Sequence, residues 1–316
     1  MGHLLAKIDS IVRISSGVLL NTPSVDSIED IKISSKHIKR GDLYIDVNNS
    51  QDDIIEAINS GAYCILSQHI EQITDDEIAW IKVEDLEKSL IKLARFFINN
   101  KDFRFIPLLD VQYALAKHLH IGQKAKLLSN STSEALVQIL TSQNETLFFV
   151  VKNSFIQDVD PTIEKRSDKI EPQKLFETSL FYCSFIFKNR YIKDIRLSSF
   201  FIPYLCSLME KLDALKIDYK VENFNNFEHF YPQFITSKLE KSDFGTTRQV
   251  VIFENNLELY HEEKKYLHKK IDQKFIADSI DELQEKNLRY ALVYGNKDDF
   301  LQGKRNIQLE LFNDIT

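Results

Sequence analysis

A hydroxyl-rich turn at residues 243–248 has the residue types best suited to binding an anion. Gly245 permits a tight turn, and Thr246, Thr247 and Arg248 follow it directly. Hydroxyl groups and a guanidinium donate hydrogen bonds to phosphate or carboxylate oxygens, and the same residue types also form simple turns. The segment therefore predicts either a phosphate or carboxylate site or a hairpin turn with an exposed arginine.

A second candidate is Glu254, the last residue of an apolar segment that begins at Arg248. Open sheets of parallel strands place their ligands at the carboxyl ends of the strands. Glu254 is therefore expected to bind a ligand if this segment is a strand of such a sheet. Upstream, the polar and aromatic segment 228–232 fits either the border of a pocket or a turn before a strand.

Phosphate loops rich in glycine are excluded by the glycine positions. The chain has 8 glycines in 316 residues, and no two of them lie within four residues of each other. The Gly-x-Gly-x-x-Gly and Gly-x-x-x-x-Gly-Lys-Ser/Thr patterns are therefore absent. A serine-rich turn at 129–133 precedes a predicted helix, with Ser131 or Ser133 as its N-cap. It predicts either a small-anion site or an ordinary capped helix.

No catalytic residue and no metal ligand is predicted. No serine or cysteine pairs with a histidine and an acid in a recognisable pattern. His261 and His268 are two helical turns apart, too far to share a metal without a third element between them. Cys64, Cys183 and Cys206 lie far apart in apolar segments. They are expected to be free buried thiols in a reducing cytosol.

Composition and charge describe a globular cytoplasmic protein. The chain is 43% hydrophobic and carries 40 basic against 47 acidic residues, a net charge of −7 without a long basic cluster. Nucleic-acid binders usually present a basic face, so no nucleic-acid partner is expected. The longest apolar segments, 181–187 and 199–209, are too short or too interrupted to span a membrane. Asp9 interrupts what would be the apolar region of a signal peptide.

Hydrophobic spacing predicts an α/β arrangement over roughly the first 100 residues. The predicted strands are 29–36, 41–47, 62–66 and 79–83, and the predicted helices are 4–20, 52–59 and 86–97. The continuous apolar segment at 62–66 is typical of a buried parallel strand.

The C-terminal third repeats this alternation. Strands are predicted at 248–254, 274–277 and 290–294, and helices at 258–271 and 281–286. Strands separated by helices indicate parallel pairing. A polar segment at 165–174, between the two α/β regions, is expected to be a surface linker. Two aromatic segments follow it, 176–186 and 200–215, and they are expected to form either core or a face that binds a partner. The expected domains are 1–105, 106–220 and 221–316.

Two N-terminal segments resemble a known family. The first segment is Ile33-Ser-Ser-Lys-His-Ile-Lys-Arg-Gly-Asp-Leu-Tyr44, which resembles the D-S-R-x-V-x-P-G-D-L-F signature in the N-terminal domain of Mur ligases. The second segment, residues 54–62, is similar to that domain's F-I-x-x-A-I-x-x-G-A segment. The resemblance covers roughly residues 4–105 and is greatest to the enzymes that add the third residue or D-Ala-D-Ala to a UDP-MurNAc-peptide. Residues 253–259 are similar to the family's G-D-M-L-E-L-G motif, with both glycines missing.

The resemblance implies that a UDP-sugar contacts the signature, where this chain has Ser34, Ser35 and Lys36 in place of Asp-Ser-Arg. Lysine cannot make the bidentate contact that arginine makes to phosphate. The family's phosphate loop T-G-S-x-G-K-T-T would correspond to 125–136, which lacks its glycines and lysine. We therefore expect neither ATP nor Mg²⁺ as a cofactor.

Together these observations predict an α/β protein with a Mur-ligase-like N-terminal domain, a degenerate α/β middle region and a small, Rossmann-like parallel-sheet C-terminal unit. The expected function is that of a bacterial pseudoenzyme of peptidoglycan (cell wall) metabolism, which binds a UDP-MurNAc-type precursor or a cell-wall synthesis protein. The alternative is an active ligase or transferase that uses a non-Walker nucleotide site at Gly245–Arg248 and Glu254.

Overall fold

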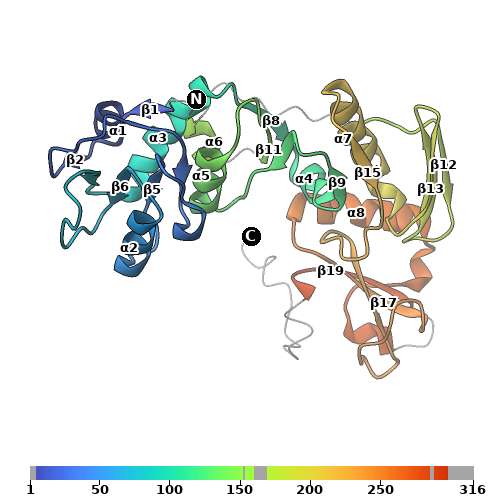
Figure 1. Cartoon of the computed structure of the whole chain (residues 1–316). Coiled ribbons are helices and arrows are strands. Elements are labelled where there is room, and N and C mark those ends of the chain that lie inside the picture. Colours follow the sequence, from blue (N-terminus) through green and yellow to red (C-terminus); the bar gives the residue numbers. More distant parts are fainter. Residues whose placement is uncertain (1–4, 152–153, 160–168, 285–287, 298–316) are drawn as a thin grey trace, which may run out of the picture. The chain divides into compact units, whose positions relative to one another are not determined.

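The computed structural model describes residues 5–151, 154–159, 169–284 and 288–297. The chain forms two compact units (Figure 1). Unit 1 comprises Met1–Leu109 and Gln123–Arg166, and unit 2 comprises Asp110–Gly122 and Ser167–Thr316.

The boundaries expected from the sequence, at residues 105 and 220, fall inside two strands, β8 (Arg104–Leu108) and β15 (Tyr219–Val221). β8 is hydrogen-bonded along its whole length within unit 1, and β15 is likewise paired within unit 2. The expected middle region is therefore divided between the two units. The surface linker expected at 165–174 lies partly outside the described residues, and its last residue begins a strand.

Unit 1 contains a five-stranded sheet that confirms the predicted α/β class. Its strands, in spatial order, are β2 (Val18–Leu19), β7 (Ala79–Lys82), β6 (Cys64–Ser67), β5 (Leu43–Ile45) and β4 (Ile31–Lys32). The four strands from β4 to β7 are parallel, and only the edge strand β2 is antiparallel. A short antiparallel pair, β1 (Ala6–Lys7) and β3 (Ser27–Ile28), accompanies this sheet.

Alternation along β5 shows that both faces of this sheet are buried. Leu43 and Ile45 belong to one apolar cluster and Tyr44 to another. The first cluster includes residues of α1 (Ile8–Ser15) and α3 (Leu86–Asn100). The second includes Ile54 and Ala57 of α2 (Gln51–Asn59). A parallel sheet covered on both faces explains why its strands read as continuous apolar segments in the sequence.

The first helix is shorter than the predicted 4–20. It ends at Ser15 because Ser16 adopts a left-handed conformation with φ of 55°. A Cβ on Gly17 would lie 2.5 Å from a side-chain carbon of Ile81, so only glycine lets the chain pass this close to β7. Val18 and Leu19 then join the sheet instead of continuing the helix.

A second, three-stranded sheet completes unit 1. It is entirely parallel, in the order β10 (Ala125–Leu127), β11 (Leu147–Val151), β8. The helix α5 (Thr132–Thr141) connects β10 to β11 and packs on α3, and α6 (Ser154–Val159) follows β11. The predicted sequence of strand, serine-rich turn and helix at 125–141 is confirmed.

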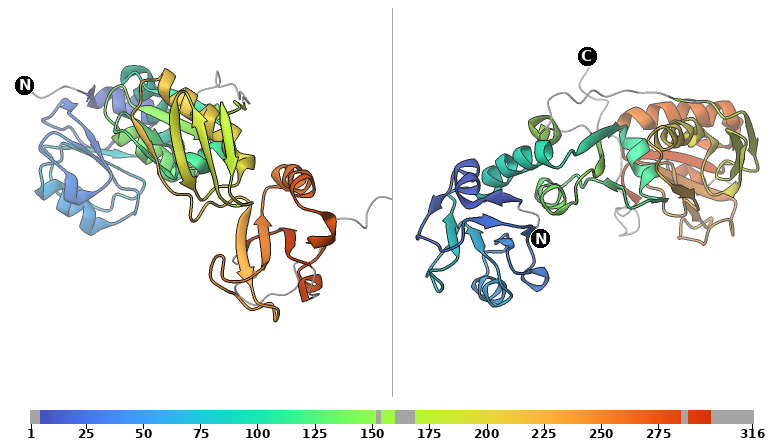
Figure 2. Two further views of the ribbon diagram at one scale, coloured as in Figure 1. Left: turned by 90° about the vertical axis from the view of Figure 1, so that its right-hand side faces the viewer. Right: turned by 45° about the horizontal axis from the view of Figure 1, so that its top comes forward.

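Unit 2 contains a three-stranded antiparallel sheet and a separate four-stranded sheet, the yellow-green and orange arrays in the left view of Figure 2. The first is formed by β12 (Lys174–Glu177), β13 (Cys183–Phe187) and β14 (Arg190–Ile195). The helix α7 (Ile202–Ala214) packs on α4 (Asp110–Ala116), and β9 (Leu119–Ile121) pairs with β15. Most large apolar side chains of 200–215 are buried, as expected for core.

The four-stranded sheet of unit 2 positions the candidate site. Its spatial order is β16 (Tyr231–Ile235), β17 (Gln249–Glu254), β19 (Tyr290–Tyr294) and β18 (Ile276–Ala277). The last three strands are parallel, as predicted, and β16 is antiparallel to β17. The helix α8 (Leu257–Lys270) follows β17. The helix predicted at 281–286 is a short 3₁₀ segment, η4 (Asp281–Gln284), over its described part.

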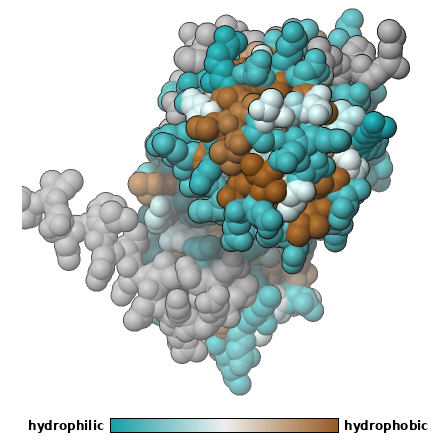
Figure 3. Space-filling view, turned by 60° about the vertical axis from the view of Figure 1, so that its left-hand side comes forward, coloured by the Kyte–Doolittle hydropathy of each residue, from teal (hydrophilic) through white to brown (hydrophobic). Residues whose placement is uncertain are grey.

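Within the described ranges, no helix has the length and apolar character needed to cross a membrane. The face shown in Figure 3 has apolar areas interrupted by hydrophilic side chains. The exposed large apolar residues of unit 1 are Val18, Leu20 and Ile55.

The Tyr44 hydroxyl generates a prediction about stability. It is buried without a hydrogen-bond partner among the described residues. Burial, and then the charges of Asp46, Asp53 and Glu56, raise the pKa of Tyr44. Because an unsatisfied buried hydroxyl costs about 1–3 kcal/mol, we expect Tyr44→Phe to keep or increase the free energy of unfolding.

Urea denaturation measures this change. Leu43→Ala, at the neighbouring and fully buried position, is the matched control and should cost about 2–5 kcal/mol. A loss of more than about 1 kcal/mol in Tyr44→Phe would contradict the expectation.

Candidate anion-binding site

Two arginines meet at the amino edge of the four-stranded sheet. Arg248 directly precedes β17, and Arg289 directly precedes β19. The two strands are parallel neighbours, and the Val250 amide donates to the Arg289 carbonyl at 2.8 Å. Both arginines are exposed, and neither has an ion pair with a carboxylate in the described part of the chain. Two arginines without an ion pair therefore precede neighbouring strands at one edge, and the Arg289 guanidinium lies 4.7 Å from the ring centroid of Phe275.

A cavity of about 350 Å³ adjoins the arginines on one side. We call it the aromatic cavity, because Phe181, Phe234, Phe244 and Tyr290 contribute to its wall. The Phe244 ring packs edge-on against Phe234 at 4.7 Å between ring centroids. The guanidinium of Arg196 lies 3.5 Å from the Phe244 ring centroid, a cation–π contact that holds the ring in place.

A second cavity, of about 340 Å³, adjoins the same arginines. We call it the amide cavity, because Gln249 and Gln284 line it together with the hydroxyl residues Thr236 and Ser237. Thr247, Arg248 and Arg289 line both cavities. Among the described residues, neither lining includes an aspartate or glutamate, and the charged side chains that line the cavities are the two arginines.

The turn predicted from the sequence borders this site. Gly245 has φ of 76°, in the left-handed region that glycine adopts readily, and lines the aromatic cavity with Thr247 and Arg248. The Thr246 hydroxyl instead donates to the Asp243 carbonyl at 2.7 Å and closes the turn. The turn does connect two antiparallel strands, β16 and β17, so it is both a hairpin connection and the border of a positively charged cavity.

Glu254 lies at the opposite, carboxyl edge of the sheet and is fully buried. Its carboxylate accepts hydrogen bonds from His229 Nδ1 at 2.9 Å, from the Phe230 amide at 3.1 Å and from the Asn256 amide at 2.8 Å. Burial alone would raise the pKa of Glu254, but the hydrogen bond and charge of His229, helped by the Asn256 amide, hold it below its ordinary value. Glu254 is therefore a structural anion that the chain satisfies internally.

Glu263, on α8, is the unexpected member of this buried cluster. It is fully buried, and its carboxyl group shares a hydrogen bond with that of Glu254. Burial first, and then the charge of Glu254, raise the pKa of Glu263 well above its ordinary value. Folding therefore favours the protonated form of Glu263.

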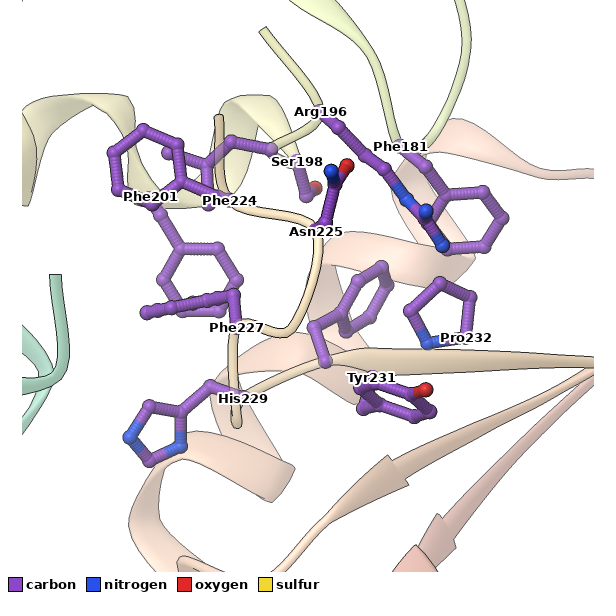
Figure 4. A pocket seen from close by; sticks show the side chains of 12 residues that line it. Phe181, Arg196, Ser198, Phe201, Phe224, Asn225, Phe227, His229, Tyr231 and Pro232 are labelled. Carbon is purple, nitrogen blue, oxygen red and sulfur yellow. The ribbon is translucent and has the colours of Figure 1, made fainter. Parts of the chain in front are cut away.

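His229 lies between this cluster and a group of aromatic rings. Figure 4 shows Phe201, Phe224 and Phe227 on the side of His229, with Arg196 and Phe181 across from them. The cavity that these side chains enclose is about 20 Å³, close to what one water molecule requires. No substrate fits beside His229. The segment 228–232 precedes and begins β16, and four of its residues, 229–232, also line this small cavity, so both of its predicted roles are found.

The signature residues of unit 1 lie on and before a single 3₁₀ turn, η1 (Ser35–His37). Ser35 is buried and its hydroxyl donates to Glu56 Oε2 at 2.6 Å. Ser34 precedes the turn without a side-chain capping bond, and Lys36 is exposed. The structure thus places these three residues in unit 1 and the turn at Gly245 in unit 2.

The serine-rich turn between β10 and α5 is occupied by side chains of α5 itself. The Ser129 hydroxyl donates to Glu134 Oε2 at 2.7 Å, and the Ser129 amide donates to Gln138 Oε1 at 2.8 Å. Ser131 stands at the N-cap position, although its hydroxyl makes no capping bond. The hydroxyl and the amide of Ser129 are therefore engaged by side-chain acceptors of α5.

Sequence reasoning missed Arg289 and the aromatic wall. Both strands follow the same local pattern, an arginine and then an apolar segment, as in Arg248-Gln-Val-Val-Ile and Arg289-Tyr-Ala-Leu-Val. Parallel pairing of these two strands places the arginines together, so the signal was present. No local sequence pattern indicated the aromatic side chains of the aromatic cavity, because Phe181 and Phe244 are 63 residues apart and meet only in the folded chain.

No group of three or more metal-ligating side chains is found among the described residues. Cys64, Cys183 and Cys206 are free and buried. Burial raises the pKa of the Cys183 and Cys206 thiols to about 12, so neither is a reactive thiolate at neutral pH.

No family model matches the chain, and no curated protein is similar to it in sequence. Among solved structures, it is similar to the MurF ligase of Thermotoga maritima in complex with ADP, with 11% identity, 76% of this chain and 74% of that chain covered, and a TM-score of 0.39. It is also similar to the UDP-N-acetylmuramoylalanyl-D-glutamyl-2,6-diaminopimelate–D-alanyl-D-alanyl ligase of Acinetobacter baumannii, with 10% identity, 95% and 88% covered, and a TM-score of 0.42. At these identities and TM-scores, nothing about the activity of this chain follows from the likeness.

The buried pair Glu254 and Glu263 predicts opposite pH effects. Folding raises the pKa of Glu263, so as pH rises above the unfolded-state value of about 4.5 the unfolded state loses this proton first and folding is penalised. Glu263→Gln should therefore raise the free energy of unfolding by about 1–3 kcal/mol at pH 7, and this gain should disappear below about pH 4.5.

Glu254→Gln is the matched variant. The pKa of Glu254 is lowered by folding, so its contribution is present above pH 4.5 and is lost as pH falls through the folded-state pKa. The variant should lose about 3–5 kcal/mol at pH 7, because His229 and two amides lose their carboxylate. Denaturant titrations between pH 4 and 8 measure both variants. A destabilised Glu263→Gln at pH 7 would contradict this account.

Proposed function

We propose that this chain is a non-catalytic, Mur-ligase-like protein of peptidoglycan metabolism that binds an anionic UDP-MurNAc-type precursor. The observation that carries the proposal is the edge of unit 2 where Arg248 and Arg289 adjoin two cavities, whose described lining residues include no carboxylate. Each cavity has the volume of a small-molecule site. The precursor as the ligand rests on the sequence resemblance of residues 33–44 and 54–62 to the Mur signature.

The absence of ATP chemistry is supported by the turn at 129–133. In a phosphate loop, backbone amides and a lysine surround the phosphates. Here Glu134 contributes a negative charge to the same turn, bonded to Ser129. A triphosphate would have to displace this carboxylate against charge repulsion, so we propose that neither ATP nor Mg²⁺ is a cofactor.

The alternative of an active ligase using Gly245–Arg248 together with Glu254 receives no support from the geometry. Arg248 and Glu254 flank opposite ends of β17. At about 3.3 Å per residue, their backbones are about 20 Å apart, too far for one reacting centre. Glu254 is moreover buried and fully engaged by His229 and two amides.

A thermal-shift titration with UDP-MurNAc-tripeptide tests the proposal, with ATP–Mg²⁺ beside it. A ligand at 100 times its dissociation constant stabilises the folded state by about 2.7 kcal/mol, so we expect the precursor to raise the melting temperature by several degrees. We expect no shift from ATP–Mg²⁺.

Two results would contradict the proposal. A shift with ATP–Mg²⁺, together with release of phosphate in the presence of an amino acid or dipeptide, would establish an enzyme. No shift with the precursor up to millimolar concentration would exclude a precursor-binding role. Lys36→Ala and Arg248→Ala, both exposed positions in different units, report which unit makes the contact.

A further inference from the structure

We infer that one face of α8, the orange helix labelled in Figure 1, is a docking surface for an acidic polypeptide segment of a partner protein. The surface is formed by four basic side chains, which we call the basic stripe: His261, Lys264, Lys265 and His268. The stripe lies on a helix, whereas the two edge arginines precede strands, so its role does not depend on the proposed function.

The spacing of the four residues places them together. They stand at positions i, i+3, i+4 and i+7, which an α-helix brings to one side. The other side of α8 is buried through Leu259, Glu263 and Leu267. A groove of about 550 Å³ adjoins the stripe, and the four basic residues are its lining among the described residues. Both lysines are exposed, so the stripe is accessible to a partner.

The described part of the chain does not neutralise the stripe. Lys264 and Lys265 have no ion pair, hydrogen bond or ring contact within it. On the same helix, Glu262 is in contrast paired with Lys169 at 3.1 Å, and it does not line the groove. A chain with a net charge of −7 thus exposes two lysine charges without a carboxylate of its own.

Helix electrostatics does not account for the two lysines. The helix dipole stabilises basic residues in the last turn, which explains Lys269 and Lys270. Lys264 and Lys265 lie in the middle of α8, where this effect has faded. Basic residues three or four positions apart also repel each other when both are charged. Local costs of this kind are expected at functional sites, where binding determines the residues.

Carboxylates are the groups that complement the stripe. Lysine ammonium groups and imidazole N–H groups donate hydrogen bonds to carboxylate oxygens. The stripe extends about 10 Å along the helix, at 1.5 Å per residue, so several neighbouring aspartates or glutamates can contact it together. A membrane surface matches it less well, because the stripe contains no apolar side chain that could enter the lipid. Nucleic-acid binding requires a broader basic face.

Fluorescence anisotropy on the full chain tests the docking surface, with a labelled oligo-glutamate peptide as the probe. We expect binding in about 20 mM NaCl and at least about tenfold weaker binding in about 200 mM, because salt screens exposed charges. An uncharged glutamine–serine peptide of the same length should not bind. Absence of glutamate-peptide binding up to millimolar concentration at the lower salt would overturn the inference, as would equal binding of the uncharged peptide.

Variants locate the contact. Lys264→Gln combined with Lys265→Gln should weaken the glutamate peptide about 5–20-fold, because two exposed charge contacts are lost. The matched control combines Lys193→Gln with Lys241→Gln, which removes the same charge from exposed positions outside α8 and should leave the affinity unchanged. Thermal melting verifies that both double variants fold like the parent. Equal loss of affinity in both would reduce the effect to net charge and overturn the surface.

Other anions and the arginine edge supply the remaining tests. Tripolyphosphate, or vesicles containing phosphatidylserine, should bind more weakly than the peptide. If either binds as tightly and the Lys264/Lys265 double variant weakens it equally, the acidic-segment assignment is overturned. Arg248→Ala should leave peptide binding unchanged, and a loss there would assign the peptide to the arginine edge instead. Failure of UDP-MurNAc-tripeptide to bind would contradict the proposed function and leave this surface standing.

Discussion

The parallel pairing of β17 with β19 is the constraint on which the candidate site depends. It gives the sheet of unit 2 two chemically different edges, because both strands begin after an arginine and only β17 ends on a buried glutamate. Antiparallel pairing would have placed Arg289 near Glu254, where the opposite charges would neutralise each other. The same pairing divides the aromatic and amide cavities between the two faces, since it fixes which residues share a face with Val250 and which with Gln249.

A recurring feature of both units is that carboxylates of the chain occupy places where a parallel α/β protein would bind an external anion or nucleotide. Glu134 bonds Ser129 in the turn after β10, and Glu254 bonds two backbone amides at the end of β17. In unit 1, Glu56 accepts the hydroxyl of Ser35 within the segment that resembles the Mur signature. These internal bonds stabilise the fold, and they engage donors that an incoming anion could otherwise use at Ser129, at Ser35 and at the end of β17.

Whether a feature of the fold or of the site could be predicted depends on how far apart in the sequence the residues that determine it lie. The strands at 62–66 and 290–294 and the helix at 86–97 were predicted well, because apolar periodicity and flanking polar residues are local. The first helix was overextended because the left-handed Ser16 and the close approach of Gly17 to Ile81 are tertiary effects. For the site, local composition indicated Gly245–Arg248, whereas the partner Arg289 depended on strand pairing. The burial of Glu254 could not be predicted, because its hydrogen bond from His229 spans 25 residues.

The position of the arginines also bears on why a binding role suits this chain better than catalysis. At the carboxyl edge of a parallel sheet, helix N-termini and backbone amides can hold a transition state rigidly. At the amino edge, the ligand meets exposed arginine side chains, which provide charge and hydrogen bonds but must lose conformational freedom on binding. Under the proposed function, such an edge would supply affinity through charge and hydrogen bonds, without the fixed geometry that accelerates a reaction.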